Sequence, residues 1–167
     1  MKKIVCLALL VSLISGSLCG CFSNVMFIPN SDSIGNGKTF ETDGLSILLT
    51  DKFTEAEVPT GFDAYFLADF CGVAVMKEEF TSKSGLADQS VKEYLASVIA
   101  SSGYTGVAPQ TKDGLWYFDA ANDETYARMY CYKGSDAFWI VQFACNPSNA
   151  RALEDTFYLF AQSVEVK

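Results

Sequence analysis

Histidine is absent from this chain of 167 residues. Imidazole is the usual general base in proteins and a common ligand of zinc and copper, so its absence excludes Ser-His and Cys-His nucleophiles and most sites for those metals. The sequence also lacks Ser-x-x-Lys, Gly-x-Ser-x-Gly, Gly-x-x-x-x-Gly-Lys and the dinucleotide-binding Gly-x-Gly-x-x-Gly. These absences argue against a hydrolase and against a nucleotide-binding protein. We expect no catalytic residue, no metal and no cofactor.

Basic residues are scarce, because 12 Lys and Arg stand against 20 Asp and Glu, which gives a net charge of -8 at pH 7. An acidic surface repels nucleic acid and anionic lipid headgroups. We therefore expect no nucleic-acid partner and no membrane binding through charge. Simple solubility accounts for the same imbalance.

The longest apolar run covers residues 4–18 and follows two lysines. It is shorter than the roughly 20 apolar residues of a membrane span, but it fits a signal peptide. The run ends in LCGC, residues 18–21, which resembles the bacterial lipobox: an apolar residue, two positions later a small one, and then the cysteine that is lipidated. We predict residues 1–20 to be a lipoprotein signal peptide and Cys21 to anchor the chain to the extracytoplasmic face of a bacterial membrane. The alternative is an ordinary secretory signal with incidental cysteines.

Residues 21–38 predict a lipidated N-terminus and a flexible linker. Pro29-Asn30-Ser31 and Gly35-Asn36-Gly37 are turn formers, and no periodic apolar face accompanies them. The remaining residues, 39–167, have the length of one domain with one proper core.

Apolar and aromatic runs from residue 39 onward are typical of strands separated by short turns. Asp43-Gly44 predicts a tight hairpin, and a turn near Asp69 divides two strands within residues 64–80. Residues 114–145 predict an antiparallel meander with turns at Asn122-Asp123 and at residues 133–136. A short edge strand is expected at residues 164–166.

Two helices are predicted. Ser90 and Glu93 form a capping box at the start of the first helix, and Gly103 closes its end. Asn146-Pro147 opens the second helix, because proline fits the first helical turn. Helical spacing gives each helix one apolar face: Val91, Tyr94, Leu95, Val98 and Ile99 in the first, and Ala150, Leu153, Phe157, Phe160 and Ala161 in the second.

Residues 138–144 are apolar at nearly every position, so we expect the central strands to be covered on both faces by the two helices. The order of elements predicts an α+β fold. It consists of an antiparallel β-sheet meander with helices packed on its faces in a three-layer α/β/α arrangement.

The GLSILLTDKF opening, and the AFWIVQFAC strand followed by a helix and a terminal strand, carry a resemblance. They resemble the fold shared by the PsbP extrinsic subunit of photosystem II, the Mog-type Ran-binding proteins and small bacterial lipoproteins of that superfamily. The resemblance implies an accessory or binding role more than catalysis. It transfers no functional residue, because the metal-linked histidines of PsbP-type proteins have no counterpart in a chain without histidine.

Three cysteines, Cys71, Cys131 and Cys145, lie in strand-like apolar segments. Reduced cysteine packs in such segments as a small hydrophobe, whereas an exported chain can also hold one disulfide and one free thiol. The turn at residues 133–136 places Cys131 opposite residues near Phe138, far along the strand from Cys145. No Cys-x-x-Cys motif supports a redox role.

Two groups of carboxylates are candidate sites. Residues 119–124, DAANDE, gather three acids and an asparagine around a hairpin end, which is either a solvated turn or a calcium loop; the spacing misses the EF-hand pattern. Glu78 and Glu79 are neighbours in a strand, so they point to opposite faces and do not form an acid pair.

Aromatic residues are concentrated in the meander, and alternation sends them to both faces of the sheet, where most belong to the core. If a helix leaves part of one face open, tyrosine and tryptophan there form a recognition patch for an envelope protein, a peptide or a glycan. The candidates are Trp116, Tyr117, Tyr130 and Tyr132, of which we expect at least two to be exposed side by side.

The sequence therefore favours a lipid-anchored extracytoplasmic lipoprotein with a non-catalytic binding or accessory domain. The alternative is a cell-envelope enzyme that uses carboxylate or tyrosine chemistry.

Overall fold

The computed structural model describes residues 37–167. The predicted signal peptide, Cys21 and most of the predicted linker lie outside the described residues. Ten strands, two α-helices and three short 3-10 helices make up the described part, and the predicted α+β class is confirmed. The first strand begins at Lys38, one residue before the predicted start of the domain.

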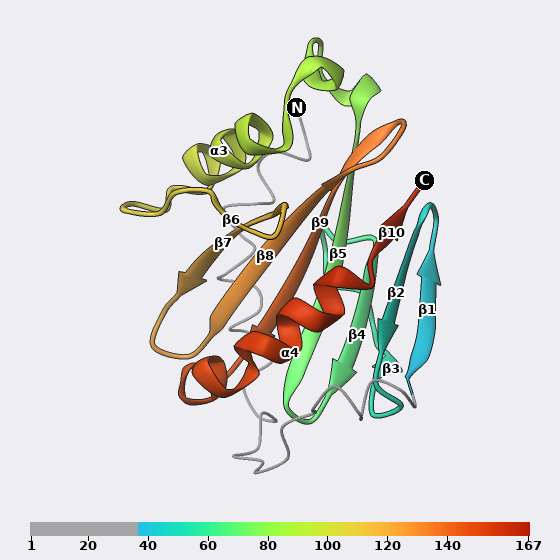
Figure 1. Cartoon of the computed structure of the whole chain (residues 1–167), viewed down its shortest axis with the longest axis vertical. Helices are drawn as coiled ribbons and strands as arrows, with labels where there is room; N and C mark the ends of the chain where they lie inside the picture. The colour runs from blue at the N-terminus through green and yellow to red at the C-terminus, as the bar shows by residue number, and fades with distance from the viewer. Residues whose placement is uncertain (1–36) are drawn as a thin grey trace.

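A seven-stranded antiparallel sheet forms the middle layer (Figure 1). The strand order is β3-β4-β5-β9-β8-β7-β6, so the predicted meander β7-β8-β9 is joined to the earlier strands by pairing between β5 and β9. The strands are β3 (Thr54–Glu55), β4 (Ala64–Ala68), β5 (Cys71–Glu79), β6 (Gln110–Lys112), β7 (Leu115–Ala121), β8 (Tyr126–Lys133) and β9 (Ala137–Cys145).

Strand β9 is buried at every residue, as its apolar sequence predicts. Its even-numbered side chains face one layer and its odd-numbered side chains face the other, because side chains alternate along a strand. The sheet thus separates two hydrophobic cores, one represented by Phe138 and Ile140 and the other by Val141 and Phe143.

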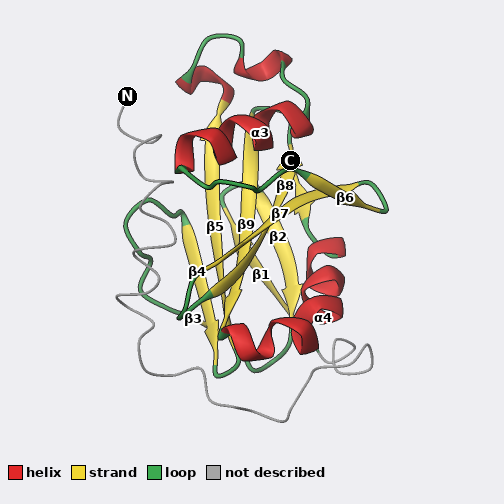
Figure 2. Cartoon of the chain, turned by 90° about the vertical axis from the view of Figure 1, so that its left-hand side faces the viewer, coloured by secondary structure: helices red, strands yellow, loops and turns green. Residues whose placement is uncertain are grey.

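Helix α3 (Val91–Ser102) covers one face of the sheet, over β7 and β8 (Figure 2). The predicted capping box is present: the Ser90 hydroxyl accepts a hydrogen bond from the Glu93 backbone N–H, and the Glu93 carboxylate accepts one from the Ser90 N–H. The helix ends at Gly103, whose φ of 77° is left-handed. Tyr94 of this helix stacks on Phe138 with 4.1 Å between the ring centroids.

The opposite face is covered by helix α4 (Ala150–Gln162) and by a second, three-stranded sheet (Figure 1). That sheet has the order β1-β2-β10 and consists of β1 (Lys38–Thr42), β2 (Leu45–Leu49) and β10 (Glu165–Val166). The hairpin and the terminal strand were predicted, and the structure adds that β10 pairs with β2. The three-layer arrangement therefore has a helix alone on one face, and a helix with a small sheet on the other.

The predicted start of the second helix is corrected. Pro147 begins a short 3-10 helix (Pro147–Asn149), and the α-helix begins only at Ala150. The Asn146 side chain accepts a hydrogen bond from the Ser148 N–H at 2.9 Å, which closes a tight turn before the α-helical pattern is established. In the described part of the chain, neither helix is long and apolar enough to cross a membrane.

Candidate binding surface

The four aromatic residues of the predicted patch do not lie together. In the β7-β8 register Trp116 is opposite Cys131, and Tyr117 is opposite Tyr130. Trp116 therefore faces α3, whereas Tyr117, Tyr130 and Tyr132 face α4. Tyr130 is only 1% exposed, and the other three side chains are partly buried. The expectation that two of the four are substantially exposed neighbours is wrong, because strand alternation puts Trp116 on the other face and the three tyrosines are buried or partly buried in the core on the α4 side.

The tyrosines on the α4 face have internal partners. The Tyr130 ring lies 5.4 Å from the Tyr117 ring and 5.9 Å from the Phe143 ring. The Tyr132 hydroxyl donates a hydrogen bond to the Ala161 carbonyl near the end of α4, at 2.7 Å. Burial raises the pKa of Tyr130 to about 12, against the opposing effect of Arg128, and burial also raises the pKa of Tyr132. Both phenols therefore keep their protons at neutral pH.

Arg128 is the centre of a polar cluster on this face. Strand β8 places it opposite Asp119 of β7, and Glu154 approaches from the first part of α4. Arg128 donates from Nε to Asp119 Oδ1 at 2.7 Å and from Nη2 to Asp119 Oδ2 at 3.0 Å, which is a bidentate pair. Nη1 and Nη2 also donate to Glu154 Oε1, each at 3.2 Å.

Two tyrosines complete this Arg128 cluster, which we define as Arg128, Asp119, Glu154, Tyr117 and Tyr126. The Tyr126 hydroxyl donates to Asp119 Oδ1 at 2.8 Å, and the guanidinium carbon of Arg128 lies 4.7 Å from the centroid of the Tyr117 ring. Burial and Asp119 raise the pKa of Tyr126. Burial alone would lower the pKa of Arg128, but the hydrogen bonds and charge of Asp119 outweigh it and raise that pKa. The arginine is thus permanently charged and bound by two carboxylates.

Arg128 was not among the residues predicted from the sequence, because the predicted turn Asn122-Asp123 is two residues shorter than the turn between β7 and β8. The turn covers residues 122–125, where Asn122 N–H donates to the Thr125 carbonyl and the Asn122 side chain accepts from the N–H groups of Glu124 and Thr125. A four-residue turn sets Asp119 opposite Arg128. A two-residue turn would instead have set Asp119 opposite Tyr126. The pairing of Asp119 with Arg128 can therefore be predicted from the sequence only if the length of the turn is predicted correctly.

These contacts also bear on the two interpretations of residues 119–124, a calcium loop or a solvated turn. Asp119 is bound by Arg128 and Tyr126, and Asn122 caps its own turn, so the oxygens of both side chains already have partners within the protein. Among residues 37–167, no group of three or more acidic or cysteine side chains gathers as metal ligands would. The solvated-turn interpretation fits this geometry.

A second group of polar and aromatic residues lies where α4 meets β6. The Tyr158 hydroxyl of α4 donates to Asp113 at 2.5 Å, and Lys112 Nζ lies 4.1 Å from the Tyr158 ring centroid. Gln110 accepts a long hydrogen bond, 3.4 Å, from the Tyr117 hydroxyl. We call Lys112, Tyr117, Tyr126 and Tyr158 the α4 seam. Its three tyrosines are partly exposed and each has a charged neighbour, and Tyr158 was not among the residues predicted from the sequence.

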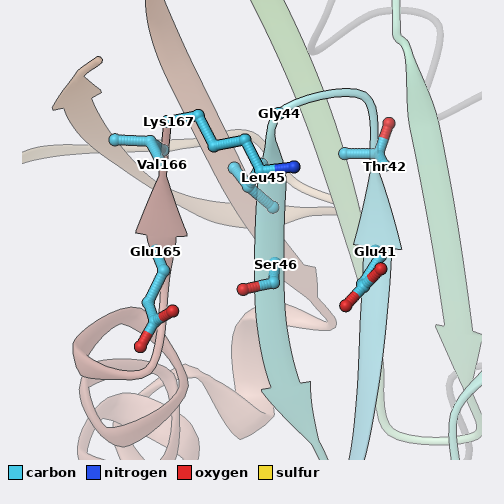
Figure 3. A pocket seen from close by; sticks show the side chains of 8 residues that line it. All are labelled: Glu41, Thr42, Gly44, Leu45, Ser46, Glu165, Val166 and Lys167. Atoms are coloured by element: carbon cyan, nitrogen blue, oxygen red, sulfur yellow. The ribbon is translucent and has the colours of Figure 1, made fainter. Parts of the chain in front are cut away.

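A shallow depression of about 260 Å³ lies on the small sheet (Figure 3). The register sets Glu41 and Glu165 on either side of Ser46, and Lys167 closes one end. Both carboxylates are exposed to solvent. The depression is open and polar, whereas a substrate site for acid-base chemistry is usually enclosed.

The other candidates from the sequence are accounted for by local contacts. Glu78 accepts a hydrogen bond from the Tyr94 hydroxyl at 2.7 Å, while Glu79 accepts one from Thr81 at 3.4 Å, and no acid pair is formed. Cys71, Cys131 and Cys145 are buried and present as free thiols. Burial raises the pKa of all three thiols, that of Cys145 to about 12.

No known protein family model matches the chain, and no curated protein sequence matches it. Solved structures do. The solution structure of cyanobacterial PsbP (CyanoP) from Synechocystis aligns with a TM-score of 0.55 at 15% sequence identity, over 85% of this chain and 99% of that one. A crystal structure from Bacteroides thetaiotaomicron aligns with a TM-score of 0.56 at 11% identity, over 79% of this chain and 49% of that one, so this chain spans about half of its length.

Similarity at these identities concerns the fold alone. The order of strands and helices, the three layers and the match to nearly the whole of CyanoP agree with one another. The chain has a PsbP-like α+β fold.

Proposed function

We propose that this chain is a lipid-anchored accessory protein of the bacterial envelope, whose PsbP-like domain binds a partner and catalyses no reaction. CyanoP is a PsbP protein by name, and the resemblance in fold supports an accessory role by analogy. The lipobox-like residues 18–21 support the anchor at Cys21 and an extracytoplasmic location.

The proposal that the domain catalyses no reaction rests on the protonation of its tyrosines and cysteines, which are candidate bases or nucleophiles in a chain without histidine. Tyrosine and cysteine act as bases or nucleophiles when their pKa falls toward neutrality. Here burial moves the pKa of Tyr130 and Cys145 to about 12, and that of Tyr126 and Cys131 is also raised. The carboxylates of the Arg128 cluster are both bound by the guanidinium.

The alternative function is a cell-envelope enzyme, whose active site would be the depression shown in Figure 3.

The α4 seam is the surface that we assign to the partner. Tyrosine offers a large contact area at low cost in conformational entropy, and Arg128 and Asp113 hold the rings of Tyr117 and Tyr158 in place before any contact is made. A protein, a peptide or a glycan presents groups that pack on such rings, and the experiment below distinguishes these classes.

A photoreactive amino acid at position 158 tests the binding proposal in the cells that make the protein. We expect a cross-linked product from Tyr158 and none from Val58, an exposed apolar residue in the segment between β3 and β4, at the other end of the large sheet. Protease and glycosidase treatment of the product identifies the class of partner. Equal labelling from both positions, or from neither, contradicts the assignment of the seam.

The anchor is tested separately by substitution of the two neighbouring cysteines. We expect the wild type to fractionate with detergent-extracted membrane and to carry acyl mass on Cys21. Cys21→Ser should lose that mass, whereas Cys19→Ser should keep it. Acylation that survives in Cys21→Ser would contradict the anchor.

A further inference from the structure

Two of the three buried cysteines face each other across neighbouring strands. Strand β5 begins at Cys71 and β9 ends at Cys145, and the antiparallel register that pairs Gly72 with Ala144 brings these two residues opposite each other one step further along. Both belong to the core beneath α4, so their side chains point to the same face of the sheet, and both are 0% exposed.

The hydrogen-bond pattern fixes which kind of pair this is. Phe80 N–H donates to the carbonyl of Asp136, its opposite residue in the same β5-β9 register, at 2.8 Å. Hydrogen-bonded and non-hydrogen-bonded pairs alternate along antiparallel strands. Even-numbered residues of β5 therefore bond to β9, and Cys71 with Cys145 is a non-hydrogen-bonded pair.

The pairing on the other side of β9 leads to the same assignment. Gly134 N–H donates to the Ala137 carbonyl at 2.9 Å, in the register that pairs β8 with β9. By alternation, Cys145 forms a hydrogen-bonded pair with Tyr126 of β8, so its backbone N–H and C=O are directed away from Cys71. Opposite residues in a non-hydrogen-bonded pair have Cα atoms about 4.5 Å apart and close side chains. That separation lies within the range that a disulfide spans, roughly 4.4 to 6.8 Å.

We propose that Cys71 and Cys145 form a cross-strand disulfide when the chain folds in an oxidising compartment. The choice of compartment rests on the extracytoplasmic location proposed above. The oxidant is a disulfide of another molecule, such as a thiol-disulfide oxidoreductase or glutathione disulfide. One cysteine thiolate attacks that disulfide to form a mixed disulfide and releases a thiol, and the second cysteine then displaces the other thiol. Two S–H bonds are lost, one S–S bond forms, and the two electrons and two protons reduce the oxidant to two thiols.

The third cysteine serves as an internal control. Cys131 lies on the α3 face opposite Ile140, so the sheet separates its thiol from the other two.

Burial and the neighbouring Cys145 raise the pKa of Cys71, so the thiolate is disfavoured once the core has closed. Oxidation therefore takes place while β5 and β9 pair, before α4 excludes the oxidant.

Peptide mapping of the wild-type full-length chain tests the disulfide. Trypsin cleaves after Lys and Arg, which places the three cysteines in separate peptides, 53–77, 129–133 and 134–151. The chain is lysed directly into denaturant that contains the alkylating reagent, because the three thiols are buried in the folded chain. It is then extracted from the membrane and digested without reductant. We expect peptide 53–77 linked to peptide 134–151, separable by reductant, and the alkyl group on peptide 129–133.

Refolding separates the disulfide from the proposed location. The purified chain, reduced and unfolded, is refolded in a glutathione redox buffer, and folding is followed by circular dichroism. A link between Cys71 and Cys145 after refolding supports the pairing, and its absence from cells would then contradict the extracytoplasmic location alone. A chain that refolds and whose Cys71 and Cys145 are both alkylated once denaturant is added overturns the proposal, as does a link to Cys131 or to the N-terminal cysteines. Cys131→Ser should retain the link.

Discussion

Arg128 is a charged residue with a side chain that is only 6% exposed, and its charge is tolerated because three groups satisfy it. Asp119 binds two of its nitrogens, Glu154 binds from the helix, and the Tyr117 ring covers the guanidinium. Removal of one partner from a buried ion pair leaves an uncompensated charge, which is costly. The two carboxylates differ, since the Asp119 side chain is 28% exposed and the Glu154 side chain is 49% exposed.

The partners of Arg128 should therefore differ in their effect on stability. We expect Asp119→Asn to lower the free energy of unfolding by about 3 kcal/mol, and Glu154→Gln by less than about 1 kcal/mol. Urea denaturation followed by tryptophan fluorescence measures both. Asp155→Asn is the control, because Asp155 and Lys112 form an exposed pair at 3.9 Å. Equal losses for Asp119 and Glu154 would contradict the assigned geometry.

Among the helices and strands, the ends and turns predicted from short sequence motifs are confirmed where neighbouring residues hydrogen-bond the backbone locally. The α3 capping box, the Gly103 end and the Asp43-Gly44 hairpin were all predicted and all are present. Gly44 has a φ of 94°, a backbone conformation that favours glycine, and an added Cβ there would make a tight contact of 3.0 Å with the Trp139 ring. The start of α4 was misplaced because Asn146 and Pro147 suit a 3-10 turn as well as an α-helix.

The cap of α3 provides a test within one helix. Ser90→Ala removes the hydroxyl that accepts from Glu93 N–H, and we expect the free energy of unfolding to fall by about 1 kcal/mol. Ser101→Ala is the matched control, because that exposed hydroxyl bonds only to the carbonyl of Val98 within the helix, and alanine has the higher helix propensity. Thermal denaturation should show a lower Tm for Ser90→Ala alone. A Tm unchanged in both variants would mean that the cap does not contribute.

At the scale of the whole molecule, burial of tyrosine on both faces of the sheet couples folding to pH. All eight tyrosines lie in the described part of the chain. Burial raises the pKa of Tyr65, Tyr104 and Tyr130 from 10.0 to about 12. A phenol with a pKa raised in the folded state contributes stability that is fully present below pH 10.0, and that stability is lost as pH rises through about 12.

Alkaline titration should therefore show a delayed and cooperative ionisation. We expect the ultraviolet absorbance of tyrosinate to stay low near pH 10 in the folded chain, and then to rise together with the loss of circular dichroism. The unfolded chain in denaturant should titrate near pH 10, which serves as the reference. Full ionisation of these tyrosines near pH 10 in a chain that is still folded would contradict their burial.

The periodic elements and the α+β class could be predicted from the amino-acid sequence, because helix faces, caps and tight turns depend on residues close together in the chain. The sequence also determined which chemistry is absent, since a chain without histidine cannot form imidazole sites in any fold. The predicted aromatic patch was wrong because its residues lie on both faces of the sheet. The predicted patch contained both Trp116 and Tyr117, which are neighbours in β7 and therefore lie on opposite faces of the sheet.

The contacts between segments far apart in the chain could be seen only in the tertiary structure. The pairing of β5 with β9, the second sheet in which β10 joins β2, and the meeting of Glu154 with Arg128 join segments far apart in the chain. No local pattern specifies such contacts, because they arise from burying apolar faces against one another and from satisfying the charges trapped between them. The opposed cysteines of β5 and β9 are the sharpest case, since each is an ordinary core residue in the sequence and only strand register makes them a pair.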